Sequence, residues 1–273
     1  MALVRLDQLL AKAGLGSRQQ VKKLIREGNV AVDGKKIDSP QQKVDPEREE
    51  VRCRGKLISA PSFTYVMLHK PDGVVSADRD NLHKTVIDLL RDLPEAEKIH
   101  PVGRLDIDTT GLMLLTDDGT LAHQLLSPRS HVEKEYEALV ERPVTDEDVR
   151  QFAEGMDIGD EKRTLPAVLR SADADDRDGQ GAGGERVRVI LREGRFHQVK
   201  RMFEKTGNHV LTLKRVRMGT LVLDPVLAKG DYRCLTDEEV KALKEEVKAL
   251  KNERACDGAG QDSDEIIRGA DEE

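Results

Sequence analysis

The stretch from His100 to Gly119, HPVGRLDIDTTGLMLLTDDG, constrains the fold of this chain more than any other segment. Its second half contains the apolar run 112–115, which is typical of a buried strand. Its first half places Arg104, Asp106 and Asp108, with two threonines, just before that run. A carboxylate at the start of a buried strand is held rigidly, as a catalytic acid must be. Aspartate is also an ordinary turn residue, so this segment alone leaves Asp106 open to a structural or a catalytic interpretation.

Composition indicates a highly charged, water-soluble protein with enough length for one large domain or two unequal ones. Charged residues make up 36% of the 273 residues and the hydrophobic set makes up 37%. No apolar run approaches the roughly 20 residues of a membrane-spanning helix, and the N-terminus lacks the layout of a secretory signal. The three cysteines, Cys53, Cys234 and Cys256, are far apart. Their number and spacing exclude a disulfide framework and fit a reducing cytoplasm.

The net charge of −7 is unevenly distributed along the chain. Two acidic segments, 171–185 and 253–273, carry −4 and −6, so the rest of the chain carries +3. Residues 1–58 alone hold 13 bases and 8 acids. A basic N-terminal region in an acidic chain favours a polyanionic partner such as nucleic acid.

The N-terminal region has the pattern of two helices followed by a β-hairpin. Leucines at helical spacing predict a first helix over 5–13, and a second helix is expected over 17–27. Two short strands flank the tight turn Asp33–Gly34. On an isolated helix a solvated charged face is the simpler interpretation of the basic residues, but the whole arrangement of two helices and a hairpin weighs against it. The basic residues of the second helix are Arg18, Lys22, Lys23 and Arg26.

This N-terminal region resembles the S-four-type RNA-binding domain, which is named after a ribosomal protein. The signature RLDxxLxxxGxxxSRxxxxxxIxxGxVxVDG is almost complete from Arg5 to Gly34. The resemblance implies binding to structured RNA, mainly through phosphate and shape contacts. The residues expected to bind RNA here are Arg5, Arg18, Lys22 and Lys23.

Beyond a boundary expected at 60–62, alternating short strands and helices predict a second, mixed domain. Segment 171–185 is expected to be a flexible loop, and the acidic residues 253–273 are expected to be disordered. Asp108, Asp117 and Asp118 are interpreted as structural turn residues. Strands are expected over 64–68, 112–116, 133–140, 186–191, 209–217 and 220–223. Helices are expected over 85–90, 120–126, 145–154, from 198 onward, and over 236–250.

Three further side chains are candidates for a site with Asp106. Tyr136 is one of three tyrosines in a chain without tryptophan, and it either fills the core or stacks on a base. Lys200 is either a solvated helix charge or the ion-pair partner of a carboxylate. His197 is a candidate base, although a lone histidine before a helix more often makes structural hydrogen bonds. The seven histidines show no zinc-binding spacing, so no metal site is expected.

Four motifs in order resemble the bacterial rRNA pseudouridine synthases of the RsuA type. The resemblance extends from residue 3 to residue 250, and in this family an S-four-type domain precedes the catalytic domain. The motifs are the segment 100–119, EKEY at 133–136, EGRFHQVKRMF at 193–203 and the apolar segment 221–223, with GDYRCLT at 230–236 matching the family's C-terminal strand.

The resemblance implies an isomerase that converts one uridine of rRNA to pseudouridine without a metal or redox cofactor. Asp106 is then the catalytic carboxylate, either as a nucleophile or as the base that removes a sugar proton. Tyr136 stacks on the extruded uracil, and Lys200 pairs with Asp106 and keeps it ionised and aimed. Arg104 enters the space that the flipped nucleotide leaves. The remaining residues expected to contact RNA are Arg195, His197, Gln198 and Leu223, with Leu223 as a wall of the pocket.

The resemblance also implies an α+β fold. An S-four-type domain is expected over 1–60, a pseudouridine synthase domain with a mixed, mainly antiparallel sheet and a central cleft over 61–252, and a disordered acidic tail over 253–273. The segments HQVKRMF and GRLDIDTTGL resemble those of small-subunit enzymes more than those of large-subunit enzymes, which predicts 16S rRNA as the substrate. The protein is also expected to be cytoplasmic and monomeric. Two alternatives remain open, a synthase for 23S rRNA and a non-catalytic ribosome-assembly factor that binds rRNA with the same fold.

Overall fold

The computed structural model contains two compact units, Met1–Phe63 and Thr64–Glu273, which are described separately. The structure describes residues 3–267 except 14, 16, 17, 47, 59–62, 91, 128, 129 and 173–183, and the side chains of 12, 18 and 253–267 are not described. The expected boundary at 60–62 and most of the expected flexible loop 171–185 therefore lie outside the described residues.

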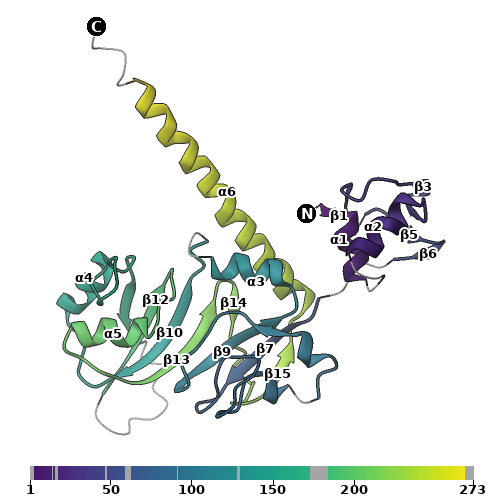
Figure 1. The fold of residues 1–273 in the computed structure, drawn as a ribbon. Helices are drawn as coiled ribbons and strands as arrows, with labels where there is room; N and C mark the ends of the chain where they lie inside the picture. The colour runs from purple at the N-terminus through teal and green to yellow at the C-terminus, as the bar shows by residue number, and fades with distance from the viewer. Residues whose placement is uncertain are drawn as a thin grey trace. The chain divides into compact units, whose positions relative to one another are not determined.

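The first unit combines two helices with two small sheets (Figure 1). Strand β1 (Val4–Arg5) pairs with β4 (Lys43–Val44), and helices α1 (Leu6–Lys12) and α2 (Arg18–Arg26) follow β1. The expected hairpin is present, with Asp33 and Gly34 both at positive φ, as a two-residue turn between twisted strands requires. The four-stranded sheet has the order β3 (Lys35–Lys36), β2 (Val30–Val32), β5 (Val51–Cys53) and β6 (Lys56–Leu57).

The helical spacing of the leucines directs one face of α1 into a small core. Leu6, Leu9 and Leu10 are buried together with Val21 and Ile25 of α2. Burial of such aliphatic side chains stabilises the unit by about 1.5–3 kcal/mol for each side chain. On the opposite face of α2, Lys23 and Arg26 are exposed and Lys22 is half-buried, which is close to the amphipathic division expected from the sequence.

The second unit is built on a nine-stranded mixed sheet (Figure 1). All but one of its described strand pairs are antiparallel, which confirms the predicted mixed and mainly antiparallel sheet. Strand β14 (Leu221–Val222) pairs with β13, and β8 (His100–Pro101) pairs with β9. The main order is β11 (Val168–Ser171), β12 (Glu185–Leu191), β10 (Lys134–Val140), β13 (Val210–Met218), β9 (Thr109–Thr116), β7 (Tyr65–Lys70) and β15 (Tyr232–Cys234).

The parallel pair joins β9 to β13, with Thr109 opposite Leu213 and Gly111 opposite Arg215. Gly111 has a φ of +105°, and a Cβ atom there would lie 2.2 Å from the carbonyl oxygen of Arg215. Only glycine avoids both the unfavourable backbone conformation and this overlap. Strand β9 begins at Thr109 rather than at the expected residue 112, because Thr109–Gly111 are the residues that pair with β13.

Helices cover the two faces of this sheet. Helices α4 (Asp146–Glu154) and α5 (Gln198–Lys205) lie beside the β11–β12–β10 end, and α3 (Gly119–Leu126) lies next to the first turns of α6 (Asp237–Ile267) (Figure 1). Tyr136 and Ala138 of β10 share one buried cluster with Val199 and Met202 of α5. The face of the sheet that carries Tyr136 is therefore the face that α5 covers.

Three local expectations differ from the structure. Segment 85–90 forms only a short 3-10 helix, η1 (Ile87–Leu89), and a second one, η2 (Ala96–Lys98), follows it. Asp118, expected in a turn, is the N-cap of α3 and accepts a hydrogen bond from the Leu121 N–H at 3.1 Å. Helix α6 continues to Ile267 rather than ending near residue 250, so residues 253–267, which were expected to be disordered, are helical. The last six residues of the expected acidic tail lie outside the described residues.

Gly111→Ala is expected to lower the free energy of unfolding by about 3 kcal/mol or more, because alanine adds both backbone strain and overlap with β13. Urea unfolding followed by circular dichroism measures this change. Gly119→Ala is the matched control, since a Cβ atom there meets nothing within 4 Å. Equal stability of the two variants would contradict the requirement for glycine at the β9–β13 junction.

Candidate active site around Asp106

Asp106 lies in the loop between β8 and β9, and a buried lysine holds the backbone of this loop. The Lys70 ammonium, at the end of β7, donates hydrogen bonds to the carbonyl oxygens of Asp106 at 3.0 Å, Ile107 at 3.3 Å and Thr109 at 2.8 Å. It also donates to the carbonyl of Pro71 at 3.1 Å. The side chain of Lys70 is completely buried. One cation therefore gathers three carbonyl oxygens of the segment that carries Asp106.

Burial lowers the pKa of Lys70 to about 8, while Asp108 and Asp106 act in the opposite direction. At pH 7 the ammonium is still protonated and can donate to all four carbonyls. Sequence reasoning missed this residue, because a lysine at the end of an apolar strand normally extends into solvent. The one available signal was its position shortly after the apolar run 65–68.

Three further hydrogen bonds fix the same loop. The Ser76 hydroxyl donates to the carbonyl of Leu105 at 2.9 Å, and the Leu105 N–H donates back to the Ser76 oxygen at 3.0 Å. The Gly73 N–H donates to the carbonyl of Ile107 at 2.8 Å. The residues on both sides of Asp106 are thus bound to the segment that follows β7, and the Asp106 side chain starts from a fixed backbone.

The Asp106 carboxylate faces two residues from the beginning of α5. The Lys200 ammonium lies 3.3 Å from Asp106 Oδ2, and His197 Nε2 lies 3.5 Å from Oδ1. About a quarter of the Asp106 side chain, 26%, is exposed, so a bound molecule can reach it. Asp106, Lys200 and His197, which the sequence singled out in two distant segments, are together in the structure.

Asp108, which was interpreted as a turn residue, shares the same lysine. Its Oδ1 lies 2.6 Å from the Lys200 ammonium, and its side chain is 66% exposed. The hydrogen bond from Lys200 lowers the pKa of Asp108. Desolvation opposes protonation of Lys200, but the contacts with Asp108 and Asp106 outweigh it and raise the lysine pKa. The lysine is therefore a charged bridge between two carboxylates of one loop.

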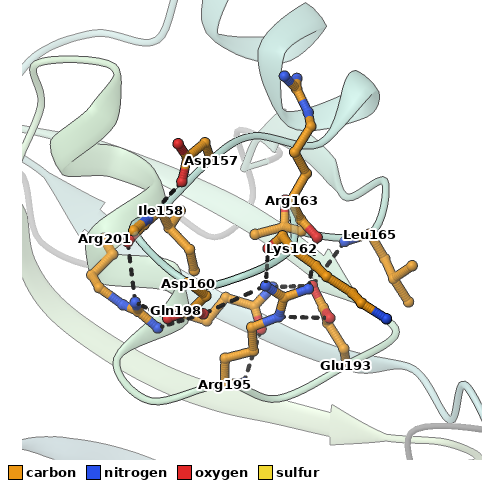
Figure 2. Close-up of polar contacts among 12 residues, drawn as sticks. Asp157, Ile158, Asp160, Lys162, Arg163, Leu165, Glu193, Arg195, Gln198 and Arg201 are labelled. Atoms are coloured by element: carbon orange, nitrogen blue, oxygen red, sulfur yellow. Dashed lines mark hydrogen bonds and ion pairs between the residues drawn. The ribbon is translucent and has the colours of Figure 1, made fainter.

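A polar network fixes the turn that leads into α5 (Figure 2). Glu193 accepts hydrogen bonds from Arg195 Nε at 2.9 Å and from Gln198 Nε2 at 2.8 Å. Arg195 also donates to the carbonyls of Lys162 at 2.5 Å and Arg163 at 2.7 Å. Gln198 Oε1 accepts the backbone N–H of Arg195 at 3.0 Å. Arg195 and Gln198, expected to contact RNA, are engaged with other parts of the protein.

A second ion pair joins the same helix to the loop before β11 (Figure 2). Arg201 Nη1 donates to Asp160 Oδ1 at 2.7 Å and to the carbonyl of Ile158 at 3.1 Å. The hydrogen bond from Arg201 lowers the pKa of Asp160. Since Lys200 lies between these two arginines in sequence, the contacts of Arg195 and Arg201 orient the part of α5 that faces Asp106.

Tyr136 and Leu223 are both buried, but they occupy different places. Tyr136 is 8% exposed and belongs to the core cluster that also contains Leu105, the neighbour of Asp106. It therefore lies on the face of the sheet that α5 covers. Leu223 is 7% exposed and does not belong to that cluster. Tyr136 and Leu223 thus lie in different parts of the buried interior.

The other residues expected to bind RNA differ in their solvent exposure and in their contacts within the protein. Arg104 is exposed beside the loop. In the first unit, Arg5 makes a two-pronged contact with buried Asp7, at 3.0 Å from Nε and 2.8 Å from Nη2. Lys22 is half-buried and Lys23 is exposed. The side chain of Arg18 lies outside the described residues.

Metal-binding clusters and membrane-spanning helices are both absent from the described residues. No group of three or more His, Cys, Asp or Glu side chains in the part of the chain that the structure describes could hold a metal ion. No described helix is long and apolar enough to cross a membrane.

Two family models match this chain. The model described as RNA pseudouridylate synthase matches residues 64–205. The model described as S4 domain matches residues 4–49.

Several curated proteins are similar over most of their length. The ribosomal small subunit pseudouridine synthase A of Yersinia pestis is 43% identical over 88% of this chain and 98% of its own. The protein of the same name from Escherichia coli (strain K12) is 42% identical over 88% of this chain and 100% of its own. An uncharacterized RNA pseudouridine synthase of Bacillus subtilis (strain 168) is 42% identical over 89% of this chain and 99% of its own.

A solved structure has the same fold. The chain described as a crystal structure of pseudouridylate synthase is 37% identical and superposes with a TM-score of 0.61. The match covers 88% of this chain and 99% of that chain.

Lys70→Met is expected to lower the free energy of unfolding by about 2–4 kcal/mol, because it leaves several buried carbonyl groups without a donor. Urea unfolding measures the loss. Lys84→Met, at an exposed lysine of the same unit, is the control and should change stability by less than about 0.5 kcal/mol. A Lys70→Met protein as stable as this control would show that the ammonium does not hold the loop.

Proposed function

The chain belongs to the RNA pseudouridylate synthase family, and from this premise we propose that it isomerises one specific uridine of 16S rRNA during maturation of the small ribosomal subunit. The catalytic carboxylate is Asp106. The observation that carries this assignment is the carboxylate itself, partly exposed on a fixed loop and 3.3 Å from Lys200. The small-subunit enzymes named among the relatives support 16S rRNA as the substrate.

The reaction is an isomerisation, so it needs no oxidant, reductant or added group. The C–N glycosidic bond of uridine breaks, the uracil rotates, and a C–C bond joins the base to the same sugar. The ring carbon that forms this bond loses its proton, and the ring nitrogen released from the sugar gains one, so the product has the same atoms as the substrate. Asp106 acts either as the nucleophile on the nucleoside or as the base that removes a proton from the sugar. Both routes require a carboxylate in direct contact with the nucleoside.

The neighbouring residues have complementary roles in this proposal. Lys200 orients the carboxylate, since its ammonium contacts both Asp106 and Asp108. Tyr136 stacks on the uracil from beneath the loop. The target base must leave its stack to reach Asp106, and exposed Arg104 enters the space that it vacates.

The N-terminal unit supplies affinity for structured RNA. Its match to the S4 domain model and the exposure of basic residues on α2 support this role. Such contacts go mainly to phosphates, so they give affinity that depends on salt rather than sequence. The substrate would then be rRNA, free or in a partly assembled subunit, and the enzyme would act as a monomer in the bacterial cytoplasm.

Two other candidate functions have less support. A synthase for 23S rRNA would have the same site but a different target, and the relatives named above favour the small subunit. A non-catalytic assembly factor would not require a partly exposed carboxylate paired with a lysine inside a polyanion-binding site. Mapping of carbodiimide-reactive pseudouridines in both rRNAs of a strain that lacks this protein distinguishes the three functions.

Asp106→Asn is expected to lower pseudouridine formation in 16S rRNA by at least about a thousandfold, while RNA affinity changes little. The amide keeps the shape of the side chain but neither attacks nor accepts a proton. Pseudouridine mapping on a 16S transcript gives the rate, and filter binding gives the affinity.

The matched control is Asp108→Asn, which removes the other carboxylate that contacts Lys200. Its rate should stay within about tenfold of the wild type, because Asp108 only helps to orient the lysine. Full activity of Asp106→Asn would overturn the catalytic assignment, whereas equal loss in both variants would point to a general effect of disrupting Lys200.

The double substitution Lys22→Gln and Lys23→Gln is expected to weaken 16S rRNA binding. It should also reduce the magnitude of the slope of log affinity against log salt concentration by about one to two, because each lost phosphate contact lowers that magnitude by roughly 0.7–0.9. Titrations at several salt concentrations measure the slope. Lys248→Gln, at an exposed lysine of α6, should leave the slope unchanged. An unaltered slope in the double variant would refute RNA binding by α2.

A further inference from the structure

Phe196 is an exposed aromatic residue next to the candidate active site. It precedes His197 at the start of α5 and is 76% exposed. Its ring stacks on the His197 imidazole, with 3.8 Å between the ring centroids and 17° between the planes. One face of the Phe196 ring is thus covered by the histidine, and its high exposure leaves the other face open to solvent.

Single exposed apolar side chains are common on protein surfaces and usually need no explanation. Phe196 differs because it stacks on His197, a residue that itself contacts Asp106. His197 has a φ of +48°, which is a left-handed conformation that non-glycine residues rarely adopt, and its Nε2 lies 3.5 Å from Asp106. Glu193, Arg195 and Gln198, which flank these two residues in the sequence, are joined by hydrogen bonds that hold the turn (Figure 2).

The surroundings of Phe196 favour a nucleic-acid base over a protein side chain. The adjacent groups are charged, with the Asp106 carboxylate and the Lys200 ammonium on the side of His197. An apolar protein partner would have to bury these charges, which is costly. A base has a flat apolar face for the ring, and its attached sugar and phosphate remain in water near the cations.

We propose that the open face of Phe196 stacks on an unpaired base that flanks the target uridine. This inference rests on the proposed function, since it assumes that a uridine of rRNA reaches Asp106. The Phe196–His197 pair then serves as a binding platform beside the reacting nucleotide and holds the neighbouring nucleotide after the helix has opened. Phe196 contributes to affinity and positioning and does not take part in bond making.

Stacking of one base on an aromatic side chain corresponds to about a fivefold to a hundredfold change in affinity when the side chain is replaced by alanine. Phe196→Ala should weaken binding to a 16S rRNA transcript within this range. At saturating RNA the single-turnover rate should stay within about threefold, because the contact is made equally before and during the reaction.

Binding is measured with full-length protein carrying Asp106→Asn, so that no turnover changes the RNA. Phe196→Tyr, which keeps the aromatic face, should bind like the parent protein. Phe196→Leu, which keeps apolar area without a planar ring, should bind nearly as weakly as Phe196→Ala. Val226→Ala, at an apolar residue that is 89% exposed, is the control for general loss of surface hydrophobicity.

A second measurement identifies the stacked nucleotide. Short RNAs around the mapped uridine carry an abasic nucleotide at one flanking position at a time, and each is titrated with the parent protein and with Phe196→Ala. At the position that stacks on Phe196, the abasic RNA should bind both proteins equally weakly. If every abasic RNA still distinguished the two proteins, stacking on a flanking base would be refuted.

Three other results would overturn the proposal. Phe196→Ala could bind RNA like the parent protein, as expected for a residue that contacts another protein. Phe196→Leu could bind as tightly as the parent protein, which would indicate simple apolar contact. The saturated rate could fall with affinity unchanged, which would place Phe196 in the chemistry. A wild-type protein that forms no pseudouridine would instead refute the proposed function, whatever the Phe196 variants do.

Discussion

The buried ammonium of Lys70 is the interaction on which the rest of the site depends. It binds carbonyl oxygens of Asp106, Ile107 and Thr109, and thereby joins the end of β7 to a loop more than thirty residues further along the chain. Without these bonds, the carbonyl groups of the loop would bind only water, and the loop would be more mobile. Because Lys70 binds its backbone, the loop holds the Asp106 carboxylate in a constant position. Desolvating a lysine is costly, and the several hydrogen bonds offset that cost.

The charges of the basic motif at 193–203 suggest a phosphate-binding surface, but most of its cations bind other groups of the protein. Arg195 binds Glu193 and two carbonyls, Arg201 binds Asp160, and Lys200 lies between two aspartates. Each of these cations is matched inside the protein and is not simply available to phosphate. Their collective effect is to fix the start of α5, which is where Lys200 and His197 meet Asp106. Under the proposed function, recognition of RNA at this end of the sheet then relies on shape and stacking beside a preformed site more than on a dense positive charge.

Much of this arrangement follows from the sequence, and the exceptions have physical reasons. Alternating patterns predicted the main strands, and the motif resemblance predicted that Lys200 pairs with Asp106. The contacts of Lys70, Arg195 and Gln198 were not predicted, because a sequence gives the type of a polar residue but not the partner that satisfies it. The early start of β9 was missed for a similar reason, since its first residues are polar and become strand only by pairing with β13. A prediction made from one segment fails when the hydrogen-bond or strand partner of a residue comes from a distant segment.

The parallel pairing of β9 with β13 explains why two distant motifs form one site. Asp106 shortly precedes β9, and α5 precedes β13, so each motif is attached to the N-terminal end of its strand. Strands that run parallel have their N-terminal ends on the same edge of the sheet, and Thr109 lies opposite Leu213 near that edge. An antiparallel pair would place the two motifs at opposite ends of a strand of eight residues, roughly 25 Å apart, beyond the reach of any side chain. The close approach that Gly111 permits against Arg215 is what allows this pair to form. A glycine without any chemical role thus determines whether the carboxylate meets its lysine.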